Sequence, residues 1–380
     1  MDFGGLKILM ISSDRNIFVP GSAVSERMKE YGGLVAELHI IVLSDSSHGL
    51  RETKIGDNVY AYPTNSASKY LRPFDAASLG KKLVLDKKFV RGNSLITAQD
   101  PFECGWAGLE IKKRWRLPLE VQLHTDPFSP YFSGILNSVR KNLASKVLKQ
   151  ADSLRVVSDS LKSHFSNLNQ KINVLPIYVD REKIENANLS FDVRARYGHH
   201  FLILCSARLT PEKDLSTALK VLNLVRKSYP DTGLLIMGAG PLESVLRKEV
   251  RDLKLEGHVE FLGWQNDPAS FYKTANAFLQ TSLFEGYGLS LVEAGLYGLP
   301  IVTTNVGLAK ELESGKEAYV AEVRDVEGLA QGLINLIEHN QIRENLRLNM
   351  REFLNKHLIS KEDYLSKLKA IWAETTLKIK

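Results

Sequence analysis

Short apolar runs that alternate with helical patterns are the feature of this chain that most constrains its fold. In the first half these runs lie at 7–11, 35–43, 94–98, 119–124 and 153–157, and in the second half at 201–206, 233–237, 258–261, 277–283 and 300–304. Amphipathic helical patterns lie among them at 139–150, 214–228, 242–252 and 326–339. Continuous apolar runs of this length are typical of strands buried on both faces of a parallel sheet that helices cover. The pattern therefore predicts an α/β protein.

The length of the chain predicts two domains. Its 380 residues are more than a single hydrophobic core ordinarily supports, and they suit two domains of roughly 150–200 residues each. A strand-like run at 172–175 leads into Pro176 and a polar connector, which places a boundary near 176–185. Residues 361–380 carry Tyr364, Leu368 and Trp372 at helical spacing and predict a terminal amphipathic helix. We expect one domain at 1–183, joined by the helix at 361–380, and a second at 184–360.

Composition is typical of a soluble globular protein, with 44% hydrophobic and 25% charged residues. The two cysteines, Cys104 and Cys205, give neither a disulfide framework nor the spacing of a metal site, which fits a reducing compartment. The first apolar run reads as a buried strand and not as a secretory leader. No apolar run approaches the ~20 residues that span a bilayer. We therefore expect a cytoplasmic protein.

The positive charge lies entirely in the first half of the chain. Residues 1–185 hold 26 Lys and Arg against 20 Asp and Glu, which accounts for the whole net charge of +6. The basic clusters lie at 81–91, 112–116 and 140–149. Such clusters suit peripheral contact with an anionic membrane at its inner face, and equally suit an ordinary solvated helix face. No zinc-finger spacing or RNA-binding aromatic motif accompanies them, so we expect no nucleic-acid partner.

One stretch, Glu285 to Glu293, combines glycines with two carboxylates. It follows a strand-like run and leads into a predicted short helix, and glycines at 286 and 288 allow positive φ and close approach of a ligand. The free N–H groups at the start of that helix favour an anion such as a diphosphate. Taken alone, the stretch is better explained as an ordinary strand–turn–helix with solvated glutamates.

Two further motifs follow strand-like runs in the second half. Arg208 and Lys213 lie on the loop after 201–206, where a guanidinium and an ammonium group suit phosphate recognition. Gly238-Ala239-Gly240-Pro241 follows 233–237 and indicates a tight turn. Ligands of open α/β sheets bind where strands end, so these loops are candidates for one site.

The first half offers weaker candidates. Gly21 and Ser22 lie between the first strand and a predicted helix, but no full GxGxxG motif is present. His124 ends the run 119–124 beside Asp126 and is a candidate hydrogen-bond donor or acid/base group. A histidine that only caps a loop explains the same pattern.

The order R-x4-K, GxGP, EGYGLSLVE and GxP resembles the retaining glycosyltransferases of family 4, also known as glycosyl transferases group 1. The resemblance covers nearly the whole chain, including residues 99–102, the run 121–132, and residues 157–158 and 261–263. It implies the GT-B fold, in which two Rossmann-like domains with parallel sheets face each other across a cleft. It also implies that the C-terminal helix crosses back to the N-terminal, acceptor-side domain and that the C-terminal domain holds most of the nucleotide sugar.

The resemblance also assigns roles to residues. Arg208 and Lys213 look like the cations that neutralise the donor diphosphate, Glu285 like a contact to hydroxyls of the donor sugar, and His124 like a hydrogen-bond partner near the reacting carbon. Glu293 looks like the ribose ligand. The other expected donor-binding positions, mainly through their backbone, are Gly21, Ser22, Gly240, Gly286, Tyr287, Gly288 and Leu289.

The implied activity is transfer of a hexose or N-acetylhexosamine from a UDP- or GDP-sugar to a hydroxyl of a sugar or lipid-linked glycan. The resemblance implies no metal and no cofactor beyond the donor substrate, since Arg208 and Lys213 supply the positive charge. Gly21-Ser22 and the segment 304–311 depart from the glycine pairs of many members. The first departure concerns close packing on the phosphate, and the second lies by the sugar end of the cleft, so the sequence does not identify the donor. A GT-B nucleotide-sugar epimerase and a non-catalytic nucleotide-sugar-binding protein remain as alternatives.

Overall fold

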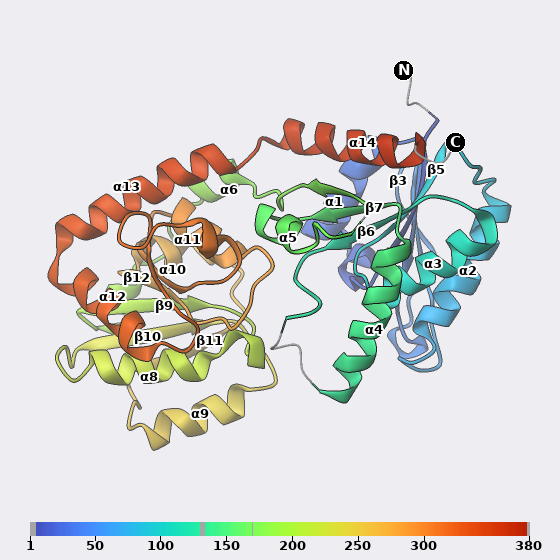
Figure 1. Cartoon of the computed structure of the whole chain (residues 1–380). Helices are drawn as coiled ribbons and strands as arrows, with labels where there is room; N and C mark the ends of the chain where they lie inside the picture. The colour runs from blue at the N-terminus through green and yellow to red at the C-terminus, as the bar shows by residue number, and fades with distance from the viewer. Residues whose placement is uncertain (1–4, 130–133, 169, 378–380) are drawn as a thin grey trace. The chain divides into compact units, whose positions relative to one another are not determined.

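The computed structural model describes residues 5–129, 134–168 and 170–377, and its chain divides into two compact units. The first unit contains 1–176 and 360–380, and the second contains 177–359. Each unit is an α/β domain built on its own, mainly parallel sheet (Figure 1). Part of the run 121–132 that carries the family resemblance, residues 130–132, and the last three residues of the expected helix 361–380 lie outside the described residues.

The first unit is built on a sheet of eight described strands in the order β3-β4-β2-β1-β5-β6-β7-β8, with β3 alone antiparallel to its neighbour. Its strands are β1 Lys7–Ser12, β2 Glu37–Val42, β3 Thr53–Gly56, β4 Val59–Pro63, β5 Ser94–Ala98, β6 Leu119–Leu123, β7 Ser153–Val156 and β8 Lys171–Val174. Its helices are α1 Ala23–Gly32, α2 Arg72–Asp86, α3 Glu103–Trp115, α4 Ile135–Gln150, α5 Asp159–His164 and α14 Lys361–Leu377, with 3-10 turns η1 Arg15–Phe18 and η2 Ser46–His48. The central strands are buried almost throughout, as their apolar runs predict.

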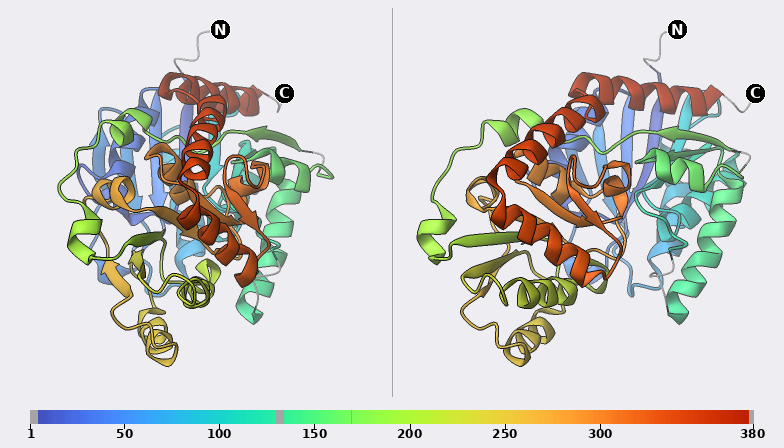
Figure 2. Two further views of the ribbon diagram at one scale, coloured as in Figure 1. Left: turned by 90° about the vertical axis from the view of Figure 1, so that its left-hand side faces the viewer. Right: turned by 60° about the vertical axis from the view of Figure 1, so that its left-hand side comes forward.

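The C-terminal helix α14 packs on the first unit, as expected from its apolar spacing. It crosses strands of the first sheet in both figures (Figures 1 and 2), and Trp372 is fully buried. The hydroxyl groups of Tyr364 and Tyr31 of α1 lie 2.7 Å apart, and Thr375 reaches Ser153 of β7 at 2.8 Å. These contacts tie the end of the chain to its first domain.

The second unit is built on a parallel sheet in the order β11-β10-β9-β12-β13-β14. Its strands are β9 Phe201–Ser206, β10 Thr232–Met237, β11 Val259–Gly263, β12 Ala277–Gln280, β13 Ile301–Thr304 and β14 Tyr319–Ala321. Its helices are α6 Arg181–Glu185, α7 Val193–Tyr197, α8 Leu215–Val225, α9 Glu243–Asp252, α10 Ala269–Thr274, α11 Leu289–Leu296, α12 Val326–Glu338 and α13 Asn340–His357, with 3-10 turns η3 Pro211–Lys213 and η4 Gly307–Glu311. Apolar side chains of β9, β10, α8 and α12 form its core.

One expected strand is shorter than its apolar run. We expected a strand over 277–283, but β12 ends at Gln280. Thr281 donates instead to the backbone carbonyls of Lys213 and Asp214, and Leu283 N–H donates to Glu212 O at 2.8 Å. The residues after β12 therefore bind the neighbouring loop and do not extend the sheet.

None of the helices in the described part of the chain is long and apolar enough to cross a membrane.

Candidate functional site

The expected donor-binding residues of the second unit converge on the carboxyl edge of its sheet. The chain runs from β9 through β10 to β11 on one side and then returns to β12 on the other side of β9. Adjacent loops after β9 and β12 therefore leave in opposite directions, which creates the crevice where open α/β sheets bind ligands. Lys213 comes from the first loop and Glu285 from the second.

Lys213 and Glu285 form an ion pair at this crevice. Lys213 Nζ lies 2.6 Å from Glu285 Oε1, and the two side chains are 16% and 11% exposed. Ser282 Oγ donates to the same carboxylate oxygen at 2.7 Å. In the absence of ligand, Glu285 thus supplies the negative charge that balances Lys213. An incoming phosphate would compete for the same ammonium group.

Arg208 lies on the same loop as Lys213, but its side chain is mostly exposed to solvent. Its side chain is 74% exposed and reaches Glu212 at 3.5 Å. A weakly paired, exposed guanidinium can turn toward a bound anion at little cost.

Gly240 supports the Arg208 loop by close backbone packing. A Cβ atom at Gly240 would lie 2.5 Å from Leu209 O, and one at Gly238 would lie 2.1 Å from Ala207 O. Leu209 N–H donates to Ala239 O at 3.1 Å. Glycine is therefore required here because the loops after β9 and β10 touch, whatever ligand the crevice holds.

The segment from Gly286 to Leu289 forms the turn into α11. Gly288 has φ +94° and caps the helix without a side chain, while Tyr287 is buried and accepts the backbone N–H of Leu308 at 2.8 Å. The first N–H groups of an α-helix lack partners within the helix, so they can bind an anion at this position.

Gly307 was not among the expected site residues, yet it supports this turn. A Cβ atom at Gly307 would lie 2.8 Å from both Glu285 Cβ and Tyr287 O. In the sequence, Gly307 is the glycine within 304–311, the segment that departs from the family pattern. The segment therefore keeps one glycine at the point where the backbone of η4 meets the Glu285 loop.

Glu293 lies one turn inside α11 and is mostly buried. Burial raises the pKa of its carboxyl group, and the Tyr272 hydroxyl partly offsets this by donating to Oε2 at 3.2 Å. The Tyr272 ring in turn stacks on Tyr297, with centroids 5.1 Å apart. Tyr272 was not expected at the site, because α10 lies on a different segment and carries no motif.

The three expected residues of the first unit lie at the carboxyl edge of its sheet. Gly21 has φ +74°, with open space where a Cβ would be, and Ser22 caps α1 by accepting from Ser25 N–H. His124 directly follows β6. Surrounding protein and the nearby guanidinium groups of Arg155 and Arg27 lower the pKa of His124 to about 4. Its imidazole is therefore neutral near pH 7.

Cys104 and Cys205 are buried free thiols, and burial raises the pKa of both. Within the described ranges, no three His, Cys, Asp or Glu side chains are grouped as a metal site would require.

Comparisons with known proteins identify the second unit by sequence and both units by fold. Residues 188–353 match the family model described as "Glycosyl transferases group 1". The poly(glycerol-phosphate) alpha-glucosyltransferase of Bacillus subtilis is 36% identical over 134 residues, 35% of this chain and 20% of that protein. The alpha-monoglucosyldiacylglycerol synthase of Acholeplasma laidlawii is 26% identical over 222 residues, 53% of this chain and 56% of that protein. This chain thus spans only part of the length of either relative.

The fold is shared along nearly the whole chain. The crystal structure of Anabaena Alr3699/HepE in complex with UDP superposes with a TM-score of 0.73 at 18% identity and covers 98% of this chain and 100% of that one. Residues 188–353 therefore belong by sequence to the glycosyl transferases group 1, and the chain has the GT-B fold, with two Rossmann-like parallel-sheet domains.

Proposed function

We propose that this chain is a retaining glycosyltransferase that uses a nucleotide diphosphate sugar, either UDP- or GDP-linked, as donor. It transfers a hexose or N-acetylhexosamine to a hydroxyl group of a sugar or lipid-linked glycan. The observation that carries the proposal is the largely buried Lys213–Glu285 pair at the crevice between β9 and β12, beside the N-terminus of α11. It combines a cation for a diphosphate with a carboxylate for sugar hydroxyls.

The proposed chemistry follows from where charge develops. As the bond between the anomeric carbon and the phosphate oxygen breaks, negative charge grows on the departing diphosphate. Lys213, Arg208 and the N–H groups of α11 stabilise that charge, and in this proposal they replace a divalent metal ion. Glu293 accepts hydrogen bonds from the ribose hydroxyls. The roles expected for Gly21, Ser22 and His124 of the first domain, toward the phosphates and the sugar of the donor, stay predictions.

Retention follows from substitution on one face of the sugar. The acceptor oxygen bonds to the anomeric carbon on the side from which the phosphate leaves, and the acceptor's proton passes to the departing phosphate oxygen. The names of both curated relatives carry the alpha configuration of the product. Common UDP- and GDP-hexose donors are alpha-linked, so an alpha product requires no inversion.

A donor screen tests the proposed activity. We expect release of nucleoside diphosphate from one UDP- or GDP-sugar, slow by hydrolysis alone and faster with a glycan acceptor, and unchanged by a chelator. Release is measured by coupled assay, and product configuration by NMR. Conversion of the donor to an epimer without release would favour an epimerase. Tight binding without turnover, with every acceptor tried, would favour a binding protein.

We also propose peripheral contact with anionic membranes through the end of α2. Lys112, Lys113 and Arg140 of the basic clusters are paired with carboxylates. The last turn of α2 and the residues after it instead carry the exposed Lys82 and Lys88 close in sequence to Leu85 and Val90, which are 60% and 51% exposed. Basic and apolar side chains in one place suit an anionic bilayer surface.

Vesicle flotation tests this contact. The protein should float with phosphatidylglycerol vesicles at low salt and remain in solution with phosphatidylcholine, because each basic residue near the surface contributes ~1 kcal/mol. Lys82→Glu with Lys88→Glu should abolish flotation. The matched control, Lys227→Glu with Lys254→Glu in the second domain, should leave it intact. Failure of the wild-type protein to bind at any salt concentration would contradict the proposal.

A further inference from the structure

A pocket of the second unit lies at the C-terminal end of α11, the end opposite to the donor crevice. It has a volume of about 250 Å³, and its lining residues are Glu185, Lys273, 295–298, Arg347, Leu348 and Arg351. These come from α6, α10, α11 and α13, which lie together in Figure 1, and both α6 and α13 pack on α11. None of the described residues that line it also lines the Lys213–Glu285 crevice.

Two glycines shape this pocket because they let α13 approach the end of α11. Gly298 has φ +75°, and a Cβ atom there would lie 3.3 Å from Arg347 Cδ. A Cβ atom at Gly295 would lie 2.8 Å from Leu354 Cδ1 and 3.0 Å from Met350 Cγ. The stem of the Arg347 side chain therefore lies against the backbone at Gly298, beside the pocket.

Among the described residues, three cations line the pocket against one carboxylate. Arg347 and Arg351 are one turn apart on α13, so their guanidinium groups lie on the same side of the helix. Arg347 is 46% exposed and pairs with an exposed carboxylate, that of Glu344. Arg351 is 61% exposed and reaches Glu185 only at 3.4 Å, while Glu185 also pairs with Arg181 at 2.9 Å. Exposed pairs of this kind contribute little, so both guanidinium groups can turn toward an anion at small cost.

Lys273 is the least exposed of the three cations. Its ammonium group donates to the backbone carbonyl of Glu185 at 3.2 Å and to that of Ala187, so it fixes the chain at the end of α6. The same ammonium group lies 5.9 Å from the centre of the Tyr297 ring. Lys273 therefore holds the wall of the pocket in place and adds positive charge to it.

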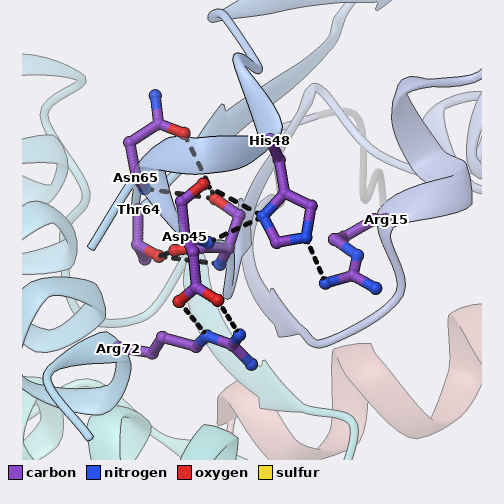
Figure 3. A network of polar contacts seen from close by, with 7 residues as sticks. Arg15, Asp45, His48, Thr64, Asn65 and Arg72 are labelled. Carbon is purple, nitrogen blue, oxygen red and sulfur yellow. Dashed lines mark hydrogen bonds and ion pairs between the residues drawn. The ribbon is translucent and has the colours of Figure 1, made fainter. Parts of the chain in front are cut away.

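A pocket of the first unit also carries cations, but its guanidinium group is already engaged. Lys69, Tyr70 and Arg72 are among its lining residues. Both donating groups of Arg72 reach the Asp45 carboxylate, with Nε donating to Oδ1 at 2.7 Å (Figure 3). Arg351, by contrast, shares its carboxylate with a second arginine and is more exposed than Arg72, 61% against 26%. The pocket at the end of α11 is therefore the better site for an added anion.

Two aromatic rings connect this pocket to the carboxylate that we propose binds the ribose. Tyr297 lines the pocket, and its ring stacks on the ring of Tyr272 with centroids 5.1 Å apart. The Tyr272 hydroxyl donates to Glu293 Oε2 at 3.2 Å. A ligand that packs on Tyr297 restricts both rings and the carboxylate that they hold. A nucleotide that binds afterwards meets a carboxylate that is already ordered, and the cost of ordering it is not incurred twice.

We propose that this pocket binds a phosphate monoester and that its occupancy raises the affinity of the donor site for the nucleotide. The phosphate lies between the guanidinium groups of Arg347 and Arg351, which suit its oxygen atoms. The organic part lies against Tyr297 and against Leu348, which is 60% exposed. The effect on the nucleotide rests on the proposed function, whereas binding in the pocket does not.

Binding of phenyl phosphate to the full chain, with saturating UDP to occupy the donor crevice, tests the pocket. Titration calorimetry should show saturable binding, tighter than that of inorganic phosphate, which lacks the organic part. Arg347→Ala and Arg351→Ala should each weaken this binding about tenfold, the size of one charge-assisted contact. Both side chains are exposed, so the variants should fold. The matched control is Arg247→Ala, which removes a 49% exposed guanidinium group from an ion pair on α9 and should leave the binding unchanged.

The coupling is measured as UDP affinity with and without phenyl phosphate. Saturating phenyl phosphate should raise UDP affinity about fivefold, and UDP should raise the affinity for phenyl phosphate by the same factor, because coupling is reciprocal. Tyr272→Phe removes the hydroxyl group that holds Glu293, so it should abolish the coupling but keep phenyl phosphate binding. Tyr297→Phe keeps the stacked ring and should preserve both.

The outcomes separate the two sites. Absence of phenyl phosphate binding would overturn the proposal, and so would binding that Lys213→Ala removes but Arg347→Ala and Arg351→Ala do not. Binding that leaves UDP affinity unchanged or lowers it would overturn the coupling. A wild-type protein that binds phenyl phosphate but fails to bind any nucleotide would count against the proposed function alone.

Discussion

Lys213→Ala should lower kcat/KM for the nucleotide sugar by about 100- to 1,000-fold, the cost of removing one well-placed group that stabilises charge in a transition state. The ammonium group is held at 2.6 Å from Glu285 in a largely buried crevice, so no water-exposed lysine can replace it. The measurement is the initial rate of nucleoside diphosphate release over a range of donor concentrations. Thermal unfolding, followed by circular dichroism, should show that the variant remains folded.

An exposed ion pair provides the matched control. Lys356 Nζ lies 2.6 Å from Glu352 Oε1 on α13, the same separation, but both side chains are about two-thirds exposed. Lys356→Ala removes the same side chain from an equally short pair and should leave the rate within twofold. Full activity of Lys213→Ala would overturn the assignment of the donor site.

Glu285→Gln separates the two roles of the pair. It keeps the shape of the side chain but removes the negative charge that competes with the donor phosphate for Lys213. UDP should therefore bind at least as tightly as it does to the wild type, while transfer slows because the amide is a weaker partner for the sugar hydroxyls. Weaker UDP binding with an unchanged transfer rate would contradict this reading.

Most of the sheet framework could be predicted from the sequence because the buried strands of a parallel sheet have continuous apolar sequences. The runs at 201–206 and 94–98 became β9 and β5 with the same bounds. The hairpin of β3 and β4 was missed because an edge hairpin with one exposed strand has no such run. The end of β12 was misplaced because Thr281 and Ser282 are as buried as strand residues. Thr281 nevertheless binds the loop after β9, and Ser282 O accepts from the Thr304 hydroxyl of β13.

The same distinction applies to the site. Lys213 and Glu285 could be anticipated because each lies on the loop that follows a strand, and the reversal of strand order brings those loops together. Tyr272 could not, because its contact with Glu293 joins α10 to α11 through side chains alone. The pocket around Lys69, Tyr70 and Arg72 was invisible for a related reason. That pocket is lined by five segments, at 13, 43, 69–72, 100–103 and 136–140, and only the fold places them at one edge of the first sheet.

Glu293→Gln should weaken UDP binding at pH 8 by about tenfold or more, the loss expected for a hydrogen bond to a charged group. The raised pKa of Glu293 gives a second expectation. The ionised carboxylate is the better acceptor for ribose hydroxyls, and it takes up a proton at a higher pH than an ordinary glutamate. Wild-type affinity should therefore fall on acidification more steeply than that of the variant. UDP affinity is measured for the wild type and the variant at pH values between 5 and 8.5. The ionisation of UDP itself affects both proteins equally and therefore cancels in the comparison.

Glu293→Gln should weaken UDP binding but should not lower the stability of the ligand-free protein. Because the pKa of Glu293 is raised in the folded state, folding favours the protonated carboxyl, and this favourable contribution is lost as the pH rises through the folded-state pKa. Glutamine has no such loss and can still accept from Tyr272. Glu293→Gln should therefore be at least as resistant to thermal unfolding as the wild type at pH 8, and its relative advantage should shrink as the pH falls from the raised folded-state pKa toward the ordinary glutamate pKa of 4.5. A variant that unfolds at lower temperature and binds UDP normally would make Glu293 a structural residue. Higher stability with weaker binding is the signature of a carboxylate kept buried for its ligand.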